Sequence, residues 1–267
     1  MTSTSLELEA LLRHYAGHEK LDHAFYRPHW WPPGVMFNAS PERRLFWSLT
    51  ESFGKKEFNA GICFIDMVGF TEKAKGKTPK EVSAIVSPFL RTVITAATEN
   101  KCFVDKTIGD EVMVVMPVFP KMDYPLSDMA WFLFGVVRRM ETMVPDVQFR
   151  AGIAFGKVIL DEIQAESYRE WSVFGNCVNG AKRLQTIETP ATVQGMSAYR
   201  AIFGAVDSDY PNFLDDFETW LGRDRSHDFR HLPPLEFLSA RKDCEELKGV
   251  GRMCFHDSFI RVKGGQQ

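Results

Sequence analysis

The sequence lacks the features that define several specialised classes of protein. Its five cysteines form no Cys-x-x-Cys pair, so neither a disulfide framework nor a zinc site is indicated, and we expect reduced, buried thiols. The N-terminus has neither the basic nor the apolar segment of a secretory signal peptide. The longest apolar run, Met129–Val137, is far shorter than the roughly 20 residues of a membrane span. We therefore expect a soluble, cytoplasmic protein with no membrane partner.

Positive charge is not in excess either. The 267 residues include 32 Lys and Arg and 35 Asp and Glu, which gives a formal net charge of -3. A nucleic-acid-binding protein usually presents an excess of basic residues, so we expect no nucleic-acid partner. Hydrophobic residues make up 45% of the chain, an ordinary globular balance, and the chain is long enough to bury a large core.

Two parts of the chain differ in pattern. Residues 1–57 contain two short helix candidates, Ser5–Ala16 and Glu42–Ser52, separated by a turn-rich aromatic stretch. From residue 58 onward, apolar runs typical of buried strands alternate with segments of helical character. We expect an N-terminal helical or irregular extension over residues 1–57 and one domain that carries the chemistry over residues 58–267.

The predicted elements of this second part favour an α+β fold. The strand candidates are Ala60–Ile65, Cys102–Lys106, Glu111–Met116, Val147–Phe155 with a continuation at Lys157–Leu160, and Ser172–Phe174. The helix candidates are Pro79–Asn100, Pro125–Met143 and Cys177–Thr186. The short link Ile108-Gly109-Asp110 indicates a hairpin, so the sheet is at least partly antiparallel. The sequence therefore predicts a mixed α/β sandwich.

The segment Phe64–Thr71 places an acidic residue at the end of a predicted buried strand. Asp66 is followed by a turn, Gly69-Phe70-Thr71, that opens the next helix. Backbone N–H groups at such a turn favour a bound phosphate, and the neighbouring carboxylate can hold the metal ion of a nucleoside triphosphate. The alternative is that Asp66 only caps the following helix.

A second acidic residue, Asp110, lies in the turn of the predicted hairpin. If this hairpin neighbours the first strand, Asp66 and Asp110 converge on one face. Two adjacent carboxylates repel each other unless a cation lies between them, which is the arrangement of a two-metal phosphoryl-transfer site. The alternative is a turn-forming Gly-Asp pair without a partner.

A third group lies on the predicted helix Cys177–Thr186. Asn179 and Arg183 are spaced i and i+4, so they share one face of that helix. An amide and a guanidinium together suit an anionic transition state in which charge develops. The alternative is an ordinary polar, solvated helix face.

These three segments, in this order, resemble the catalytic domain of class III nucleotidyl cyclases. Two further segments extend the resemblance, Arg150-Ala151-Gly152-Ile153 and Glu246-Leu247-Lys248-Gly249. The resemblance implies a central, mostly antiparallel sheet flanked by helices, and conversion of a nucleoside triphosphate into a 3′,5′-cyclic nucleotide and pyrophosphate. It also implies two divalent cations per site, Mg²⁺ or Mn²⁺, with Asp66 and Asp110 as the metal ligands.

The resemblance further implies a role for each residue that matches a motif. These roles are base contact for Lys106 and Ser172, ribose orientation for Asn179, transition-state stabilisation for Arg183, and triphosphate contact for Arg150 and Lys248. In this family each active site forms across a head-to-tail dimer, in which one subunit supplies the aspartate pair and the other supplies the residues that match Lys106, Ser172, Asn179 and Arg183. The chain carries both sets of residues, so the resemblance implies a symmetric homodimer with two shared active sites.

Hydrogen-bonding types leave the nucleobase open. Lys106 only donates, whereas Ser172 donates or accepts, and adenine, cytosine and uracil each satisfy this pair. Guanine is less favoured because the usual acidic partner is absent.

The organisation of the chain gives a further indication of the substrate. A stand-alone chain without a recognisable sensor module resembles the bacterial pyrimidine cyclases of anti-phage signalling. This resemblance implies UTP over CTP as substrate and cUMP or cCMP as a messenger for a downstream effector. The alternatives are an adenylyl cyclase that makes cAMP from ATP and a non-catalytic nucleotide-binding regulatory module. A palm-type polymerase is disfavoured by the net charge.

Overall fold

The computed structural model describes residues 57–100, 102–118, 125–165, 168–188, 199–206, 212–222 and 235–262. The helices expected at Ser5–Ala16 and Glu42–Ser52 lie outside these residues. The boundary between the extension and the domain therefore stays a prediction.

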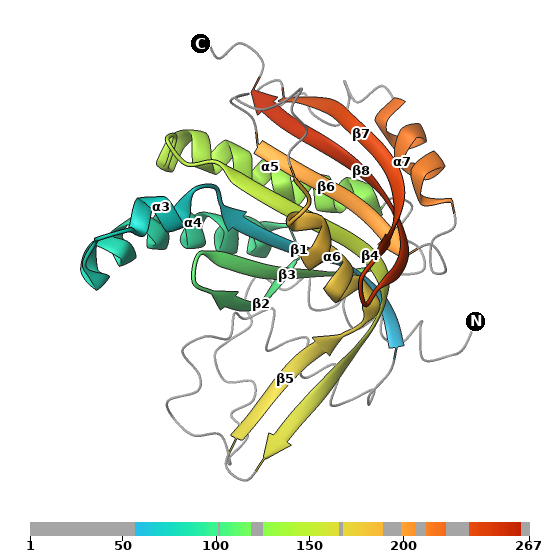
Figure 1. Ribbon diagram of the computed structural model, residues 1–267, viewed down its shortest axis with the longest axis horizontal. Helices are drawn as coiled ribbons and strands as arrows, with labels where there is room; N and C mark the ends of the chain where they lie inside the picture. The colour runs from blue at the N-terminus through green and yellow to red at the C-terminus, as the bar shows by residue number, and fades with distance from the viewer. Residues whose placement is uncertain are drawn as a thin grey trace. The chain divides into compact units, whose positions relative to one another are not determined.

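Helices and strands follow one another along the described chain as shown in Figure 1. Their order is β1 (Glu57–Met67), α3 (Phe70–Ala74), α4 (Pro79–Glu99), β2 (Phe103–Ile108), β3 (Glu111–Val118), α5 (Pro125–Met143), β4 (Phe149–Ala165), β5 (Tyr168–Phe174), α6 (Asn176–Gln185), β6 (Tyr199–Val206), α7 (Phe213–Gly222), β7 (Leu235–Leu247) and β8 (Gly251–Val262). The predicted strands and helices between residues 60 and 186 are confirmed, with ends that differ by a few residues in most cases.

The described strands form one eight-stranded sheet. Its order is β2-β3-β1-β4-β6-β8-β7, and β5 pairs with β4 outside this path. The pairing of β4 with β6 is parallel, and the other strand pairs are antiparallel. The expected hairpin is present because β2 and β3 are joined by Gly109 and Asp110 alone, and Gly109 has the positive φ of 63° that such a short turn requires. The predicted mostly antiparallel α+β fold is confirmed.

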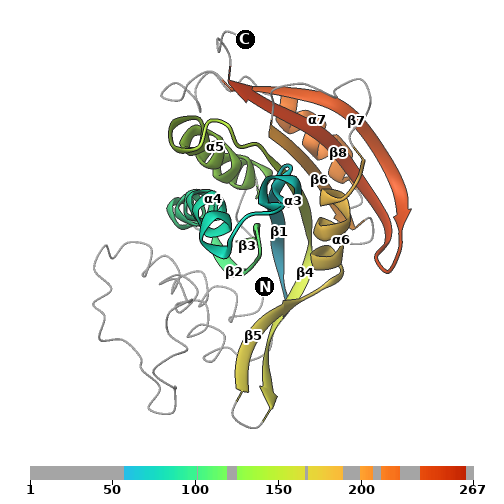
Figure 2. The same cartoon turned by 60° about the vertical axis from the view of Figure 1, so that its left-hand side comes forward.

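Alternate residues of each strand point to opposite faces of the sheet. On one face, Cys63, Ile65 and Met67 of β1 belong to the core that also includes side chains of α4, α5 and α7. The residues between them, Phe64 and Asp66, therefore point to the other face, which α6 covers (Figure 2). The alternation of apolar residues in β1 thus places its terminal aspartate on the same side as α6.

Glycine allows α6 to lie directly on the sheet. A Cβ atom at Gly152 of β4 would lie 2.2 Å from the carbonyl oxygen of Ala181 and 2.3 Å from the backbone nitrogen of Gln185. Any larger residue at this position would push the helix away from β4. The side chains that α6 carries are therefore held at a fixed height above the sheet.

The helices on the opposite face begin and pack as their sequences indicate. Thr78 precedes α4, and its hydroxyl accepts from the backbone N–H of Glu81, whose carboxylate accepts from the N–H of Thr78. The apolar run Met129–Val137 lies in α5 and packs in the core. Within the described ranges, no helix has the length and apolar character needed to cross a membrane.

The largest departure from the predicted elements is the arm formed by β4 and β5. The sequence predicted only Ser172–Phe174 as a strand there, but β5 begins at Tyr168 and pairs with β4 from Ile159 to Ala165. Figure 1 shows this two-stranded arm extending away from the rest of the sheet. Its sequence alternates irregularly between charged and apolar residues, so no apolar run marked it.

The expectation of reduced thiols was wrong for two of the five cysteines. Cys244 of β7 and Cys254 of β8 are directly opposite each other in the antiparallel pair, with Cα atoms 4.0 Å apart, and their sulfurs are bonded. The pairing could not be recognised because β7 and β8 were not predicted as strands. The remaining three, Cys63, Cys102 and Cys177, are buried thiols outside this disulfide, as expected.

Candidate active site

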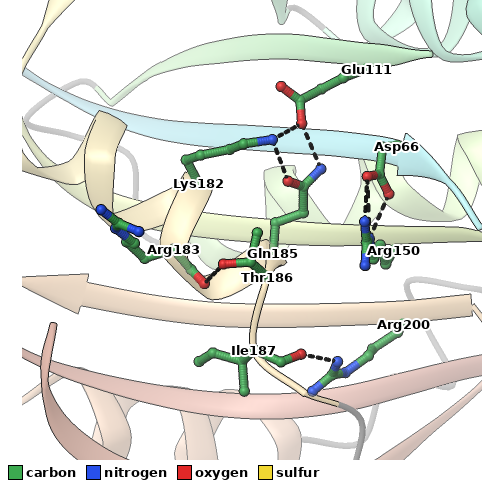
Figure 3. A network of polar contacts seen from close by, with 9 residues as sticks. All are labelled: Asp66, Glu111, Arg150, Lys182, Arg183, Gln185, Thr186, Ile187 and Arg200. Atoms are coloured by element: carbon green, nitrogen blue, oxygen red, sulfur yellow. Dashed lines mark hydrogen bonds and ion pairs between the residues drawn. The ribbon is translucent and has the colours of Figure 1, made fainter. Parts of the chain in front are cut away.

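Asp66 and Arg150 form an ion pair at the end of two neighbouring strands. They are direct partners in the β1–β4 register, so their side chains project from the same face of the sheet. Arg150 Nε lies 2.9 Å from Asp66 Oδ1, and Arg150 Nη2 lies 2.9 Å from Asp66 Oδ2 (Figure 3). Burial raises the pKa of the Asp66 carboxyl, and the hydrogen bonds and charge of Arg150 oppose this shift. Arg150 therefore neutralises a carboxylate that is only 8% exposed.

Asp110 belongs to the same group of charges. It lies in the turn between β2 and β3, and β3 is the direct neighbour of β1. Burial raises the pKa of the Asp110 carboxyl, and the negative charge of Asp66 raises it further, while backbone hydrogen bonds lower it. The structure thus brings the two predicted metal ligands close enough to repel each other.

The two carboxylates fit a hard divalent cation. Carboxylate oxygens are the ligands that Mg²⁺ and Mn²⁺ prefer, and a cation between two aspartates removes their repulsion. Among the described residues, no group of three or more His, Cys, Asp and Glu side chains gathers around a common point. Within the described ranges, Asp66 and Asp110 are therefore the acidic residues that fit the cation best, and the Asp66 oxygens are at present hydrogen-bonded to Arg150.

The turn after β1 carries the three predicted phosphate-binding residues. Gly69 is the residue before α3 and has a φ of 73°, a left-handed conformation that favours glycine. Phe70 and Thr71 are the first two residues of α3. All three follow Asp66 within five residues, so they lie beside the aspartate pair, and their contact with phosphate stays a prediction.

The two predicted base-contacting residues meet within the chain. Lys106 Nζ donates to Ser172 Oγ at 3.2 Å, although the two residues are 66 positions apart. The lysine also lies 3.2 Å from Asp105 Oδ2. Asp105 is 1% exposed and lies where the β2–β3 register shifts by one residue, a bulge that re-aims neighbouring side chains. Asp105 is thus a buried acidic neighbour of Lys106, and the roles of Lys106 and Ser172 in base contact stay a prediction.

The remaining predicted residues lie apart from the aspartates. Asn179 and Arg183 are exposed on α6, and Arg183 points away from Asp66 (Figure 3). Lys248 is exposed in the turn between β7 and β8. Among the described residues, no hydrogen bond or ion pair joins these three side chains to either aspartate.

Sequence reasoning missed a cluster on the other face of α6. Lys182 forms an ion pair with Glu111, and both contact Gln185 (Figure 3). Lys182 and Gln185 are spaced i and i+3, which puts them on one helix face. That spacing could have indicated the helix half of the cluster, but the contact with Glu111 spans 71 positions and has no local signature.

Comparison with known families identifies the class of domain. A sequence profile described as "Adenylate and Guanylate cyclase catalytic domain" matches residues 54–201, more than half of the chain. The chain therefore belongs to this family and carries a class III nucleotidyl cyclase catalytic domain.

Individual relatives agree with this assignment. An uncharacterized protein of Mycobacterium tuberculosis, Rv1320c, is 22% identical over 212 residues, which are 79% of this chain and 37% of that protein. The chain thus spans little more than a third of the length of that curated relative.

Two solved structures share the fold. The guanylyl cyclase Cya2 superposes with a TM-score of 0.57 at 15% identity, over 80% of this chain and 98% of that one. The adenylyl cyclase CyaB from P. aeruginosa gives a TM-score of 0.55 at 14% identity, over 80% of this chain and 100% of that one. One neighbour is named a guanylyl cyclase and the other an adenylyl cyclase, and both share the fold of this chain.

Proposed function

We propose that the protein converts a nucleoside triphosphate, UTP in preference to CTP, into the 3′,5′-cyclic nucleotide and pyrophosphate. The active unit is a head-to-tail homodimer with two shared active sites. The cyclic pyrimidine nucleotide would serve as a messenger to a downstream effector in anti-phage defence. Membership of the cyclase family supports the reaction. The separation of the site residues into two groups within one chain supports the dimer.

The observation that carries this proposal is the separation of the site into two halves within one chain. Asp66, Asp110 and Arg150 gather at the end of the central strands, whereas Asn179 and Arg183 face outward on α6. Among the residues that the structure describes, Arg150 is the guanidinium that pairs with the aspartates, and Arg183 makes no such contact. A second copy in head-to-tail orientation supplies its α6 to the first copy's aspartates, and symmetry completes both sites.

Exposed apolar side chains next to the site residues support a covering second copy. Ile108, two residues before Asp110, is 59% exposed, and Phe174, two residues after Ser172, is 49% exposed. Val68, two residues after Asp66, is 42% exposed. A second copy that covers the site would bury these three side chains as well.

The protein's own residues would bind and orient the nucleotide. On substrate binding, Arg150 exchanges the Asp66 carboxylate for the triphosphate, which frees both oxygens of Asp66 for a cation. Bound divalent cations would lower the pKa of the ribose 3′-hydroxyl and neutralise the pyrophosphate. Asn179 of the second subunit fixes the ribose, and its Arg183 stabilises charge on the α-phosphate as the 3′-oxygen attacks.

The base pocket would be built around the Lys106–Ser172 pair. Lys106 presents a donor to a ring nitrogen or carbonyl of the base, and the Ser172 hydroxyl, held at 3.2 Å from it, donates or accepts beside it. Asp105 stays buried under Lys106 and orients its ammonium group. This pair suits uracil and cytosine, and it suits adenine by the same hydrogen bonds, so ATP is the competing substrate.

A product assay tests the proposal directly. Purified full-length protein would be incubated with Mn²⁺ and, separately, UTP, CTP, ATP and GTP, and the products identified by mass spectrometry. We expect cyclic UMP as the main product, with cyclic CMP next. Dominant cyclic AMP would reject the pyrimidine preference, and no cyclic product from any substrate would favour a regulatory module that binds nucleotide.

Subunit mixing tests the shared sites. Asp66→Ala and Arg183→Ala proteins should each be inactive, and their mixture should recover activity because one heterodimer contains one intact composite site. The exchange of subunits would be verified by native mass spectrometry. Continued inactivity of a verified heterodimer would contradict the head-to-tail arrangement.

A further inference from the structure

A polar cluster of two buried residues, Glu111 and Gln185, and the exposed Lys182 connects the sheet to α6 beside the aspartate pair. Lys182 Nζ contacts Glu111 Oε2 and lies 2.8 Å from Gln185 Oε1, to which it donates. The amide nitrogen of Gln185 donates to the same Glu111 oxygen at 2.9 Å. Figure 3 shows the three side chains closing a triangle between β3 and α6. Each member is thus hydrogen-bonded to both of the others.

The two ends of this cluster belong to different halves of the candidate site. Glu111 is the first residue of β3 and follows Asp110 directly. Lys182 and Gln185 lie in α6, the helix that carries Asn179 and Arg183. Loss of this contact would therefore alter the charge beside the aspartates and, at the same time, the position of α6 with its exposed residues Asn179 and Arg183.

Burial and charge make the lysine necessary for Glu111. Glu111 is 8% exposed and Gln185 is 1% exposed, so the carboxylate has little access to water. The Lys182 ammonium, also 5.6 Å from the centre of the Phe64 ring, is the cation that compensates it. The negative charge of Glu111 also raises the pKa of both Asp66 and Asp110, which places it within electrostatic range of the pair.

We propose that Lys182 is a positioning residue that serves both composite sites of the dimer. By neutralising Glu111, it prevents a third carboxylate from drawing the divalent cation away from Asp66 and Asp110. Through Gln185 it anchors α6, and with it the Asn179 and Arg183 that the chain supplies to the other site. This inference rests on the shared-site homodimer proposed above.

Cation titration distinguishes this role from a merely structural one. Lys182→Met should lower kcat about tenfold and also lower the Mn²⁺ concentration for half-maximal activity, since an uncompensated Glu111 attracts the cation. The dissociation constant for Mn²⁺, measured by isothermal titration calorimetry without nucleotide, should fall in parallel. Glu111→Gln combined with Lys182→Met should restore the Mn²⁺ requirement. A loosened structure would instead weaken cation binding, so a raised Mn²⁺ requirement would overturn the charge role.

A matched control is available in another lysine–glutamate pair. Lys242 of β7 pairs with Glu218 of α7, and both side chains are about half exposed. Lys242→Met should change neither kcat nor the Mn²⁺ requirement. A response equal to that of Lys182→Met would overturn the proposal, because it would show that loss of any such pair has the same effect.

Mixed dimers separate the two ends of the contact. In a dimer of Asp66→Ala and Arg183→Ala chains, the single intact site takes its aspartates from the Arg183→Ala chain and its α6 from the Asp66→Ala chain. Lys182→Met placed in the aspartate donor should lower the Mn²⁺ requirement. The same change in the α6 donor should lower kcat with an unchanged Mn²⁺ requirement.

The outcomes of this experiment are separable. An effect in only one placement would overturn the inference while leaving the proposed function in place. No recovery in the mixture without Lys182→Met would overturn the shared-site dimer itself, and the inference with it. Effects of the two expected kinds in the two placements would support both.

Discussion

The two halves of the candidate site differ in how the single chain holds them. At the end of the central strands, Asp66 is held by the two-pronged contact of Arg150, and the neighbouring Glu111 is held by Lys182. On the outer face of α6, Asn179 and Arg183 are exposed, and within the described residues their side chains make no hydrogen bond or ion pair. One half is preorganised before any partner binds, and the other is presented to solvent.

This difference indicates where substrate and partner act. The preorganised half carries repelling carboxylates that only a cation and a phosphate can satisfy fully. The exposed half has the hydrogen-bonding groups of an anion site, and in the described part of the chain these groups contact neither aspartate. The comparison therefore predicts that substitutions in the first half change both stability and activity, and substitutions in the second half change activity alone.

The largest expected effect is the removal of a metal ligand. Asp66→Ala or Asp110→Ala should lower the rate of product formation about a thousandfold or more, because the cation loses one of its two predicted carboxylate ligands. The rate would be measured with saturating Mn²⁺, and circular dichroism would verify folding. Asp146→Ala, at an exposed loop position, is the matched control and should keep full activity. Retained activity in either site variant would reject the assignment of the metal ligands.

Two arginine substitutions, one in each half of the site, test most directly whether the chain holds the two halves differently. Arg183→Ala should lower kcat by about 10²–10³-fold and leave the melting temperature unchanged, since the side chain is exposed and stabilises only the transition state. Arg150→Ala should lower both activity and melting temperature, because the mostly buried Asp66 loses its counter-ion. Thermal unfolding would measure the stability of the two variants, and steady-state kinetics would measure their activity. Equal losses of stability would mean that the halves are not held differently.

A smaller effect is expected in the base pocket. Ser172→Ala removes one hydrogen bond to the base and should raise KM for the preferred nucleotide about tenfold with little change in kcat. Ser172→Thr keeps the hydroxyl and should stay close to the original KM. A fall in kcat at constant KM would place Ser172 in transition-state stabilisation rather than in base recognition.

The position of the two aspartates could be predicted from the sequence better than the contacts around them, for a physical reason. Asp66 and Asp110 sit at a strand end and in a two-residue turn, which are local features that apolar runs and glycine reveal. Arg150 follows from the register of β1 with β4, and the motif that contains it was recognised by resemblance. Local patterns therefore located the charged end of the sheet.

Contacts that depend on the register of distant segments were not predictable in this way. The carboxylate of Asp105 contacts the ammonium group of its neighbour Lys106 where β2 has a bulge, and no residue in the segment indicates a bulge. The Glu111–Lys182 contact joins residues 71 positions apart and follows from the close seating of α6 on Gly152. The cystine of β7 and β8 was missed because it needs both strands to be known. Each of these is a tertiary relation that propensity and spacing do not encode.

The last and smallest expected effect concerns the repulsion between the aspartates. The pKa of Asp66 and of Asp110 is raised, for both mainly by burial, so their charged forms are disfavoured in the folded protein. Stability contributed by such groups is present below the pKa of the unfolded chain and is lost as pH rises through the raised pKa. At neutral pH both carboxylates therefore oppose folding unless a cation is bound.

Asp110→Asn tests this linkage without disturbing the Arg150 contact. In the absence of divalent cations, the variant should melt about 1–2 °C higher than the original protein near pH 7, and the difference should disappear as pH falls through the raised pKa. Addition of Mn²⁺ should raise the melting temperature of the original protein but not that of the variant. Asp146→Asn should show neither effect. A lower melting temperature for Asp110→Asn at neutral pH would mean that the charged Asp110 stabilises the fold without a cation. The idea that the two aspartates repel each other until a cation binds would then be wrong.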